Sequence, residues 1–331
     1  MLNSNFPISR TIMVASWNNK TTADEVAEYL SSEIKDKNVL VTGVSLGGIG
    51  GEAARVVAKY GNLVILGGRN QEKLDETAAS IKAEIPTANL RTLILDLTSL
   101  PSVEAAAATV NSWTEPIHVL INNAAVPTRK ELTLIEGVEV QFRSNFVAPF
   151  LFTNLILGRI KAAASADFSP RIVNVGSSAH RFSPVRLEDY NFTDGSYNQF
   201  VGYGQSKTAD ILFSVELAKR LAKYGILSYS VHPGAAWTPG ALAMKPELIK
   251  LGLIDEDGNA LSASVDEFKS LGAAAATHIA AAFDPSIKDQ SGSYLFDCQV
   301  RKDLVAPHAI DPEISAKLWA LAEKLLGKNF E

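Results

Sequence analysis

Short apolar runs alternate with stretches of helical periodicity along most of this 331-residue chain. Strand-like runs separated by helices are typical of a parallel sheet whose crossover helices cover both faces. The alternation therefore predicts an α/β fold with a doubly wound parallel sheet of about seven strands, flanked by helices. The expected strands are 38–41, 63–66, 91–95, 119–121, 171–175 and 227–231, and the expected helices are 50–59, 71–83, 103–113, 138–160, 203–222 and 271–283.

An N-terminal segment precedes the alternation. An apolar stripe that includes Val26 and Ile34 predicts a helix over about 22–34. We expect residues 1–36 to form an N-terminal helical extension and residues 37–331 to form a single domain.

Two polar stretches, about 179–202 and 235–265, interrupt the alternation. Both follow strands on the side where open α/β sheets bind ligands, and long loops in compact domains are usually functional. We expect them to be substrate loops. The aromatic residues of the first stretch are expected either to wall a substrate pocket or to pack in the core: Phe182, Tyr190, Phe192, Tyr197 and Phe200.

Composition excludes several other functions. The net charge of −5 gives no reason to expect nucleic acid as a partner. The single cysteine, Cys298, excludes an internal disulfide and a cysteine-based metal cluster, which fits a reducing compartment such as the cytoplasm. The five histidines are dispersed, so no metal site is expected. No apolar run reaches the length of a membrane span, and we see no secretory signal.

A glycine-rich loop, Thr42–Gly51, joins the first expected strand to a helix. Glycines let backbone N–H groups approach a pyrophosphate, and the helix N-terminus adds favourable partial charge. The loop therefore predicts a dinucleotide site, with a plain flexible turn as the alternative. Whether Gly47 or Gly48 faces the pyrophosphate is open. The candidate cofactor-binding residues here are Gly43, Ser45, Leu46, Gly48, Ile49 and Gly50.

The residues after the second strand indicate which dinucleotide binds. An NAD-specific site usually offers a carboxylate there, whereas this chain has Arg69 and no acid before Glu72. The planar guanidinium of Arg69 suits a 2′-phosphate, and Lys73 lies one turn later. The sequence therefore favours NADP(H) over NAD(H). The alternative is a solvated arginine at a helix start.

Polar residues also end the next two strands. Asp96, followed by Leu97, ends the third strand, where its carboxylate could accept from an adenine amino group or cap a helix. Asn123 and Ala124 end the fourth strand. Small and amide residues there would let a cofactor lie against the sheet edge, although a polar turn is an alternative.

Tyr203 and Lys207 lie four residues apart, about one helical turn, so both side chains would stand on one helix face. A phenol has a pKa near 10, and a neighbouring cation stabilises the phenolate. Ser177 ends the preceding strand-like run. This spacing is compatible with proton transfer, but a Tyr-x-x-x-Lys pair also occurs by chance.

Several motifs in consistent order resemble one family. The chain is similar to classical short-chain dehydrogenases/reductases, and most similar to their retinol-dehydrogenase-like and WW-domain-oxidoreductase-like branch, in the style of fungal reductases. The resemblance covers about residue 38 to the C-terminus. It rests on the Thr42–Gly50 loop, Asn122-Asn123-Ala124, Asn145, the run Arg171–Ser177, Tyr203 with Lys207, His232-Pro233-Gly234, and Asp311-Pro312-Glu313 with Lys317-Leu318-Trp319.

The resemblance implies a Rossmann-type fold and a catalytic set. Tyr203 would be the acid/base, Lys207 would lower its pKa and hold the nicotinamide ribose, and Ser177 would hydrogen-bond the substrate oxygen. Ser178 is the alternative to Ser177. Asn145 would anchor a water that relays protons to Lys207.

The resemblance also assigns the nicotinamide end of the cofactor. Pro233 and Gly234 would line the nicotinamide, and Thr238 would hold its carboxamide. Two departures from the family pattern remain: one glycine comes a residue late in the first loop, and the interval from Ser177 to Tyr203 is long.

The expected function is that of an NADPH-dependent carbonyl reductase or alcohol dehydrogenase acting on a fairly apolar small molecule. A catalytically silent NADP-binding sensor or scaffold is the alternative from another class, and a redox isomerase or epimerase is a third. The resemblance further implies a homodimer formed through helices 138–160 and 203–222.

Overall fold

The computed structural model describes residues 17–261 and 267–331, and its centre is an eight-stranded sheet. The strands are β1 Asn38–Thr42, β2 Leu63–Gly68, β3 Leu90–Ile94, β4 Val119–Asn122, β7 Arg171–Val175, β8 Leu227–His232, β11 Tyr294–Phe296 and β12 Gln299–Val300. Their order across the sheet is β12-β11-β8-β7-β4-β1-β2-β3. All neighbours pair parallel except β12, which pairs antiparallel with β11 at one edge. The predicted doubly wound parallel sheet is confirmed.

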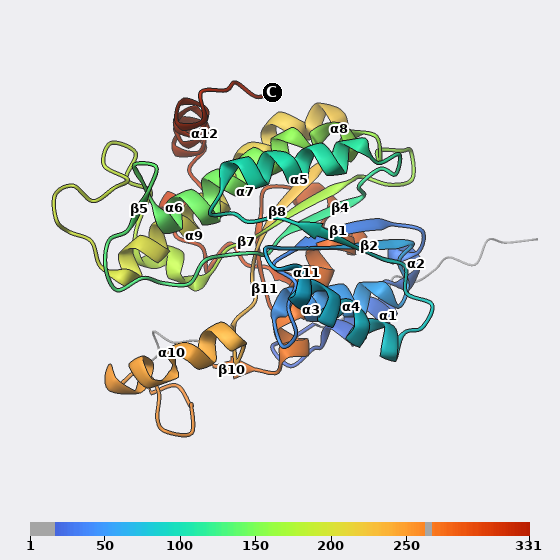
Figure 1. Cartoon of the computed structure of the whole chain (residues 1–331), viewed down its shortest axis with the longest axis horizontal. Helices are drawn as coiled ribbons and strands as arrows, with labels where there is room; N and C mark the ends of the chain where they lie inside the picture. The colour runs from blue at the N-terminus through green and yellow to red at the C-terminus, as the bar shows by residue number, and fades with distance from the viewer. Residues whose placement is uncertain (1–16, 262–266) are drawn as a thin grey trace, which may run out of the picture.

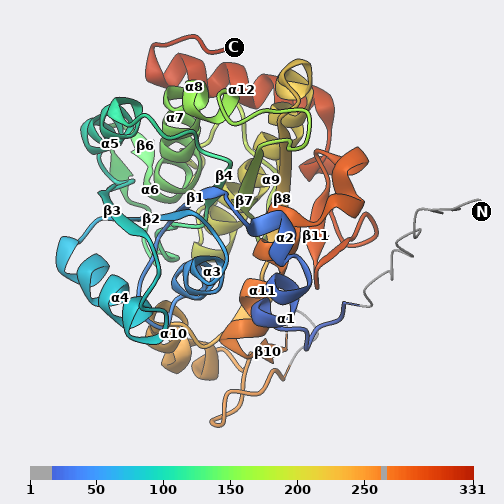
Figure 2. The same ribbon diagram turned by 90° about the vertical axis from the view of Figure 1, so that its right-hand side faces the viewer.

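Two helix layers cover the sheet (Figures 1 and 2). Alternate strand residues face opposite layers: Val39 and Val41 belong to one core cluster and Leu40 to the other. The first layer consists of α1 Ala23–Tyr29, α2 Ser31–Ile34, α3 Ile49–Ala58, α4 Gln71–Glu84 and α11 Leu271–Phe283. The second layer consists of α5 Leu100–Ser112, α6 Val140–Phe142, α7 Ala148–Leu155, α8 Leu157–Lys161, α9 Gln199–Leu221 and α12 Pro312–Leu326.

The first described helices belong to the first layer. Val26, Leu30 and Ile34 are fully or almost fully buried, in one core cluster with residues of α3 and α11. Thr22 starts α1 with a capping box, in which its hydroxyl and the Glu25 carboxylate bond each other's backbone N–H groups. The expected helix over 22–34 is divided into two helices at Leu30.

The expected helix over 138–160 is interrupted. A two-residue strand, β6 Val138–Glu139, pairs with β5 Leu134–Ile135, and a π-helical turn, Arg143–Val147, separates α6 from α7. Pro149 gives a physical reason, because it has no N–H to bond the Asn145 carbonyl in α-helical register and its ring would clash there.

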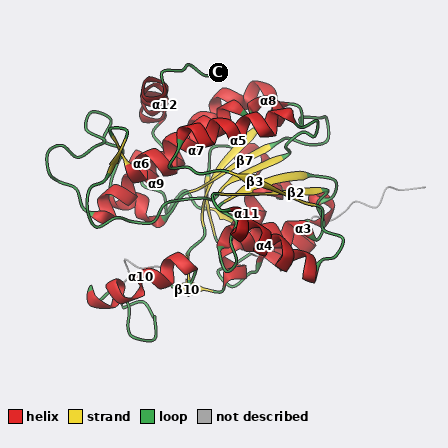
Figure 3. Cartoon of the chain, in the orientation of Figure 1, coloured by secondary structure: helices red, strands yellow, loops and turns green. Residues whose placement is uncertain are grey.

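The second expected loop contains secondary structure. Over 235–265 the chain forms β9 Ala235–Ala236 and the helix α10 Pro239–Lys250, and β9 pairs with β10 Phe268–Lys269. Residues 262–265 of that stretch lie outside the described residues. The helix α10 stands apart from both layers (Figure 3). The stretch 179–202 is mostly irregular, as expected, and ends in the first residues of α9.

A search of the described helices for one long and apolar enough to cross a membrane finds none.

Candidate active site

A pocket of about 1330 Å³ lies where the parallel strands end, lined by the loops after β1, β2, β3, β4, β7 and β8 and by residues of α9 and α10. It brings together most of the residues predicted from the sequence. The predicted residues that line it are Gly43, Ser45, Gly48, Ile49, Arg69, Asp96, Leu97, Asn123, Ala124, Ser177, Tyr203, Lys207, Pro233, Gly234 and Thr238. Leu46, Gly50 and Asn145 do not line it.

The glycine loop is shaped by close backbone approach. Gly43 and Gly47 have φ angles of +72° and +69°, which favour glycine. A Cβ on Gly43 would lie 2.6 Å from the Ala124 Cα. Gly48, unlike Gly47, lines the pocket and is the residue from which α3 begins. A Cβ on Gly48 would lie 2.8 Å from the Ser45 Oγ.

The three predicted residues outside the pocket have other surroundings. Leu46 is exposed, and a Cβ on Gly50 would lie 2.3 Å from the Asn123 Nδ2. The side chain of Asn145, in the π turn, accepts from the Val126 N–H at 2.7 Å and donates to the Ser206 Oγ at 3.1 Å. Gly50 thus allows Asn123 to approach the start of α3 closely, and Asn145 links the π turn to Val126 and to α9.

The ends of β1 and β4 are joined by hydrogen bonds. The Thr42 Oγ1 accepts from the backbone N–H groups of Asn123 and Ala124, both at 3.0 Å. Asn123 donates back to the Thr42 carbonyl at 2.8 Å. The sequence did not indicate this role of Thr42, although the residue stands directly before Gly43.

Two cations line the pocket after β2. Arg69 and Lys73 are exposed, and no side-chain hydrogen bond or ion pair within the described residues engages either one. Asn70, between them, caps α4 by accepting from the Lys73 N–H. The exposed charges are therefore free for an anion.

Asp96 does not cap the next helix. Ser99 is the N-cap of α5, whereas the Asp96 Oδ1 accepts from the N–H and the hydroxyl of Thr98. Its carboxylate therefore holds its own loop in shape at the edge of the pocket.

Ser177 is held at the end of β7. Its Oγ accepts from the Ala179 N–H at 3.1 Å, and its carbonyl accepts from the backbone N–H and the ring of His180. His180 is fully buried, and its other ring nitrogen accepts from the Ala306 N–H at 3.0 Å. This fixes the tautomer, with the proton on Nδ1. His180 therefore ties Ser177 to the C-terminal segment, a role that the sequence did not indicate.

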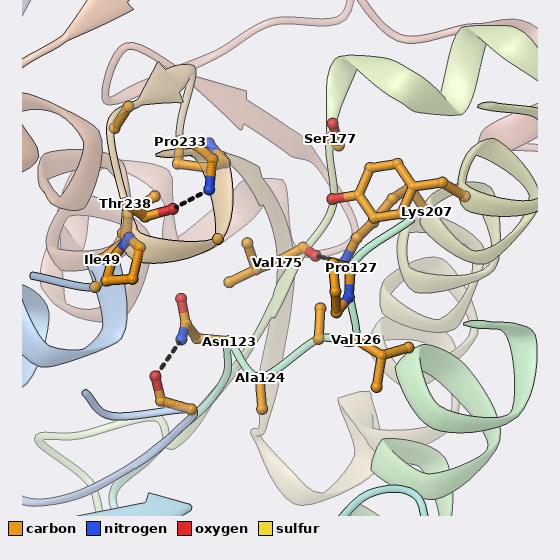
Figure 4. A pocket seen from close by; sticks show the side chains of 18 of the residues that line it. Ile49, Asn123, Ala124, Val126, Pro127, Val175, Ser177, Lys207, Pro233 and Thr238 are labelled. Atoms are coloured by element: carbon orange, nitrogen blue, oxygen red, sulfur yellow. Dashed lines mark hydrogen bonds between the residues drawn. The ribbon is translucent and has the colours of Figure 1, made fainter. Parts of the chain in front are cut away.

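Tyr203 and Lys207 lie on α9, with the Lys207 Nζ 5.6 Å from the centre of the Tyr203 ring. The Lys207 ammonium donates to the Val175 carbonyl at 2.8 Å and to the Asp210 Oδ2 at 2.9 Å. Ser177 and Lys207 lie on one side of the pocket, and Ile49, Pro233 and Thr238 lie on the other (Figure 4). Asp210 was not singled out from the sequence.

The Pro233–Thr238 segment enters α10. Gly234 has a φ of +79°, and the Thr238 Oγ1 caps α10 by accepting from the Ala241 N–H. Trp237 stacks on Phe268, with ring centroids 3.9 Å apart and nearly parallel planes. Phe268 lines the pocket.

The mouth beside Tyr203 is largely apolar. Two of the five aromatic residues expected to wall the pocket line it: Phe182 and Phe200. The other three line no part of it. Phe192 is buried, and the Tyr197 hydroxyl donates to the Arg129 carbonyl. Pro127, Arg129, Val201, Leu248 and Leu253 complete the mouth.

The helix α10 is held over the mouth by two polar contacts. Glu247 pairs with Lys130 at 2.7 Å, and the Thr128 hydroxyl contacts the Met244 sulfur at 3.4 Å. Among the described residues no group of three or more His, Cys, Asp and Glu side chains is placed to hold a metal ion.

The parallel sheet with a glycine loop and a Tyr-Lys helix at one pocket defines a dinucleotide-binding oxidoreductase of the Rossmann type. The model of the short chain dehydrogenase family matches residues 37–247, and the chain belongs to that family.

Curated relatives agree with this assignment. The chain is 34% identical over 302 residues to the short-chain dehydrogenase/reductase prx1 of Penicillium rubens, covering 88% of this chain and 86% of the relative. It is 34% identical over 294 residues to retinol dehydrogenase 13 of Homo sapiens, covering 89% and 86%. These relatives place the chain in the retinol-dehydrogenase-like branch.

Solved structures share the fold. An uncharacterized protein from Mycobacterium paratuberculosis superposes with a TM-score of 0.65 at 26% identity, covering 91% of this chain and 98% of that one. L-Sorbose reductase from Gluconobacter frateurii, solved with NADPH and L-sorbose, superposes with a TM-score of 0.60 at 22% identity, covering 79% and 95%.

Proposed function

We propose that the protein is an NADP(H)-dependent carbonyl reductase or alcohol dehydrogenase that acts on a fairly apolar small molecule. The observation that carries this proposal is the composition of one pocket. Tyr203, Lys207 and Ser177 line it together with two exposed cations, Arg69 and Lys73. The first group suits proton transfer to a carbonyl, and the second suits a phosphate.

The pocket fits a dinucleotide. Side chains at Gly43 and Gly48 would collide with the Ala124 backbone and the Ser45 hydroxyl, so the loop keeps its backbone accessible. We propose that this loop holds the pyrophosphate and that Asp96, Asn123 and Thr238 hold the rest of the cofactor.

The charge of the pocket supports NADP(H). Its lining has four cationic side chains, Arg69, Lys73, Arg129 and Lys207, and one acidic side chain, Asp96, although the chain as a whole carries −5. Arg69 and Lys73 are the pair proposed to bind the 2′-phosphate, since a guanidinium forms charge-assisted bonds with phosphate oxygens. The sorbose reductase of the same fold carries NADPH.

The chain's own residues would manage the proton. When bound, the nicotinamide supplies a hydride to the carbonyl carbon. Tyr203 donates its phenolic proton to the carbonyl oxygen, Ser177 hydrogen-bonds the same oxygen, and Lys207 stabilises the phenolate. Asn145 is proposed to anchor a water near Lys207, as its position in the π turn allows.

The apolar mouth supports the substrate class. Phe182, Phe200, Leu248 and Leu253 line the same pocket as Tyr203. Retinol dehydrogenase 13, a relative, is named for an apolar alcohol. Because Leu248 lies on α10 and Leu253 follows that helix, we propose that the second long loop shapes substrate choice.

Separate titrations with NADPH and NADH, followed by oxidation assays against ketones, aldehydes and quinones, test the proposal. We expect Arg69→Ala to weaken NADPH binding about tenfold or more and to leave NADH binding nearly unchanged, since a charge-assisted bond contributes about 1.5–3 kcal/mol. Tighter binding of NADH by the wild-type protein would contradict the NADP(H) proposal.

The other outcomes decide between functions. NADPH binding with no turnover of any carbonyl would favour a sensor or scaffold, and turnover of substrate without net nicotinamide oxidation would favour an isomerase or epimerase.

The cytoplasm remains our proposed compartment, supported by the single buried thiol of Cys298. One relative is a chloroplastic short-chain dehydrogenase of Brassica napus, 32% identical over 321 residues.

A homodimer also remains a proposal, and size-exclusion chromatography with light scattering tests it. In this structure α12 packs along α9, one of the two helices expected at the interface.

A further inference from the structure

Two buried acceptors share the ammonium of Lys207. The Val175 carbonyl and the Asp210 carboxylate accept from Nζ at 2.8 and 2.9 Å. The side chains of Lys207 and Asp210 are only 3% and 7% exposed. A lysine ammonium has three N–H donors, so one remains to face the pocket.

Tyr203, Lys207 and Asp210 form one stripe of α9. Their spacings of four and three residues place them on the same helix face. Tyr203 and Lys207 line the pocket, whereas Asp210 does not. Asp210 therefore lies behind Lys207 as seen from the substrate, one helical turn further along.

The pair is electrostatically coupled. Burial lowers the pKa of Lys207, but the attraction of Asp210 and Tyr203 outweighs it and raises that pKa above its ordinary value. Burial raises the pKa of Asp210 to about 6 against the opposing attraction of Lys207. Near neutral pH the two side chains therefore form an ion pair.

Other titratable groups lie on the elements packed against α9. Among the described residues, the charges of Asp210 and Tyr203 raise the pKa of Lys207, and the charge of Lys207 opposes the rise in the pKa of Asp210. These other groups are Glu139 and Arg143 near α6, Arg171 on β7, His180 and Arg181 after β7, Tyr229 and His232 on β8, His308 near the C-terminus, and Glu313, Lys317, Glu323 and Lys324 on α12.

We propose that Asp210 is a positioning residue for hydride transfer. Its carboxylate fixes the Lys207 ammonium, offsets part of its charge, and so sets the pH range in which Tyr203 exchanges its proton. The inference rests on the proposed function, because it needs Tyr203 as the proton donor. Asp210 acts through Lys207 and does not touch the substrate.

The proposal predicts a shift in pH dependence. In Asp210→Asn the whole charge of Lys207 acts on Tyr203, so the phenolate forms at lower pH. We expect the acidic limb of the pH–rate profile for alcohol oxidation to move to lower pH by about one unit. Lys207 loses its counter-ion, so the alkaline limb moves down as well. NADPH affinity should change less than about threefold, since the lysine keeps its place beside Val175.

The matched control is Glu216→Gln. Glu216 is also a buried carboxylate on α9, paired with Arg220 at 2.7 Å, and it lines no part of the pocket. Its pH profile should match the wild type. Asp210→Glu keeps the charge and should keep both limbs within about 0.3 pH units of the wild type, because only the charge sets them.

An ultraviolet titration of tyrosinate tests the same point without substrate. The tyrosinate absorbance of Tyr203 is the part that Tyr203→Phe removes. It is measured once in the wild-type background and once in the Asp210→Asn background, or in Asp210→Ser if the asparagine variant does not fold. We expect that signal to appear at lower pH in the uncharged variant. An unchanged tyrosinate signal and unchanged limbs would overturn the role of Asp210, while an inactive wild-type protein would overturn the proposed function and leave this titration informative.

Discussion

Tyr203, at the residue scale, depends on neighbours that α9 and β7 supply. The ring lies 5.6 Å from the Lys207 Nζ, and Lys207 is itself held by the Val175 carbonyl at the end of β7. The phenol is half-buried, so it reaches the pocket while its ring is packed. Tyr203 is therefore the proposed proton donor, whereas Lys207 and the Val175 carbonyl only support it.

Replacing Tyr203 tests its role as the proton donor. In Tyr203→Phe we expect kcat to fall by about 10²–10⁴-fold, because the general acid is lost, with NADPH affinity within a few-fold of the wild type. Steady-state kinetics and fluorescence titration measure the two quantities. Tyr190→Phe, a half-buried tyrosine that lines no part of the pocket, is the control and should retain full activity. Normal turnover in Tyr203→Phe would show that the mechanism is wrong.

At the scale of elements, the sequence predicts what local pattern determines. The strands β1, β2, β4, β7 and β8 follow their apolar runs closely, and the glycine loop is recognisable because its position between strand and helix is local. The division at Pro149 shows the limit, since apolar periodicity continues through a π turn that breaks hydrogen-bond register. The short strand β12 has no such pattern and depends on pairing with β11.

For the site, too, the sequence predicts the residues that belong to local motifs but not those that support them. Tyr203, Ser177 and Arg69 belong to motifs with fixed spacing. Asp210 and His180 support them through contacts that only the fold creates, such as the bond from the Ala306 N–H to the His180 ring. An aspartate three residues after Lys207, within the otherwise apolar run 209–213, is the sequence signal that could have indicated Asp210.

The helix α12 is attached to the second layer by Trp319. Its ring centroid lies 4.7 Å from that of Phe150, and Arg220 lies over the ring. We expect Trp319→Ala to lower the free energy of unfolding by about 3–5 kcal/mol, because a buried ring is removed from a packed cluster. Urea denaturation measures this. The exposed Ile310→Ala should change stability by less than about 0.5 kcal/mol, and a similarly small effect at Trp319 would contradict the packing argument.

At the scale of the whole molecule, burial of histidines makes stability depend on pH. Burial lowers the pKa of His278 in α11 and of His180 after β7 to about 4, from an ordinary value of 6.5. In the unfolded chain both rings bind protons below about pH 6.5, while in the folded protein they stay neutral down to about pH 4. Stability contributed by neutral burial is therefore present above pH 6.5 and is lost as the pH falls toward 4.

Denaturation curves recorded between about pH 7 and pH 4 test this linkage, with a loss of up to about 3 kcal/mol expected from each histidine. In His278→Leu the free energy of unfolding should fall less over this pH range, because the contribution of one of the two histidines is absent. An identical pH dependence in that variant and the wild type would contradict the assignment of His278 as a buried neutral ring.

The stacked pair of Trp237 and Phe268 gives the protein an internal optical reporter. The indole directly precedes Thr238, lies against an aromatic ring of the pocket lining, and has the Lys245 ammonium 5.5 Å from its centre. Reduced nicotinamide absorbs light in the range in which tryptophan emits, so a reduced cofactor bound as proposed would quench Trp237 by energy transfer. Displacement of α10 would change the polarity around the same indole and shift its emission maximum. The part of the intrinsic fluorescence that Trp237→Phe removes can thus report the occupancy of the pocket and the position of α10 before any substrate is identified.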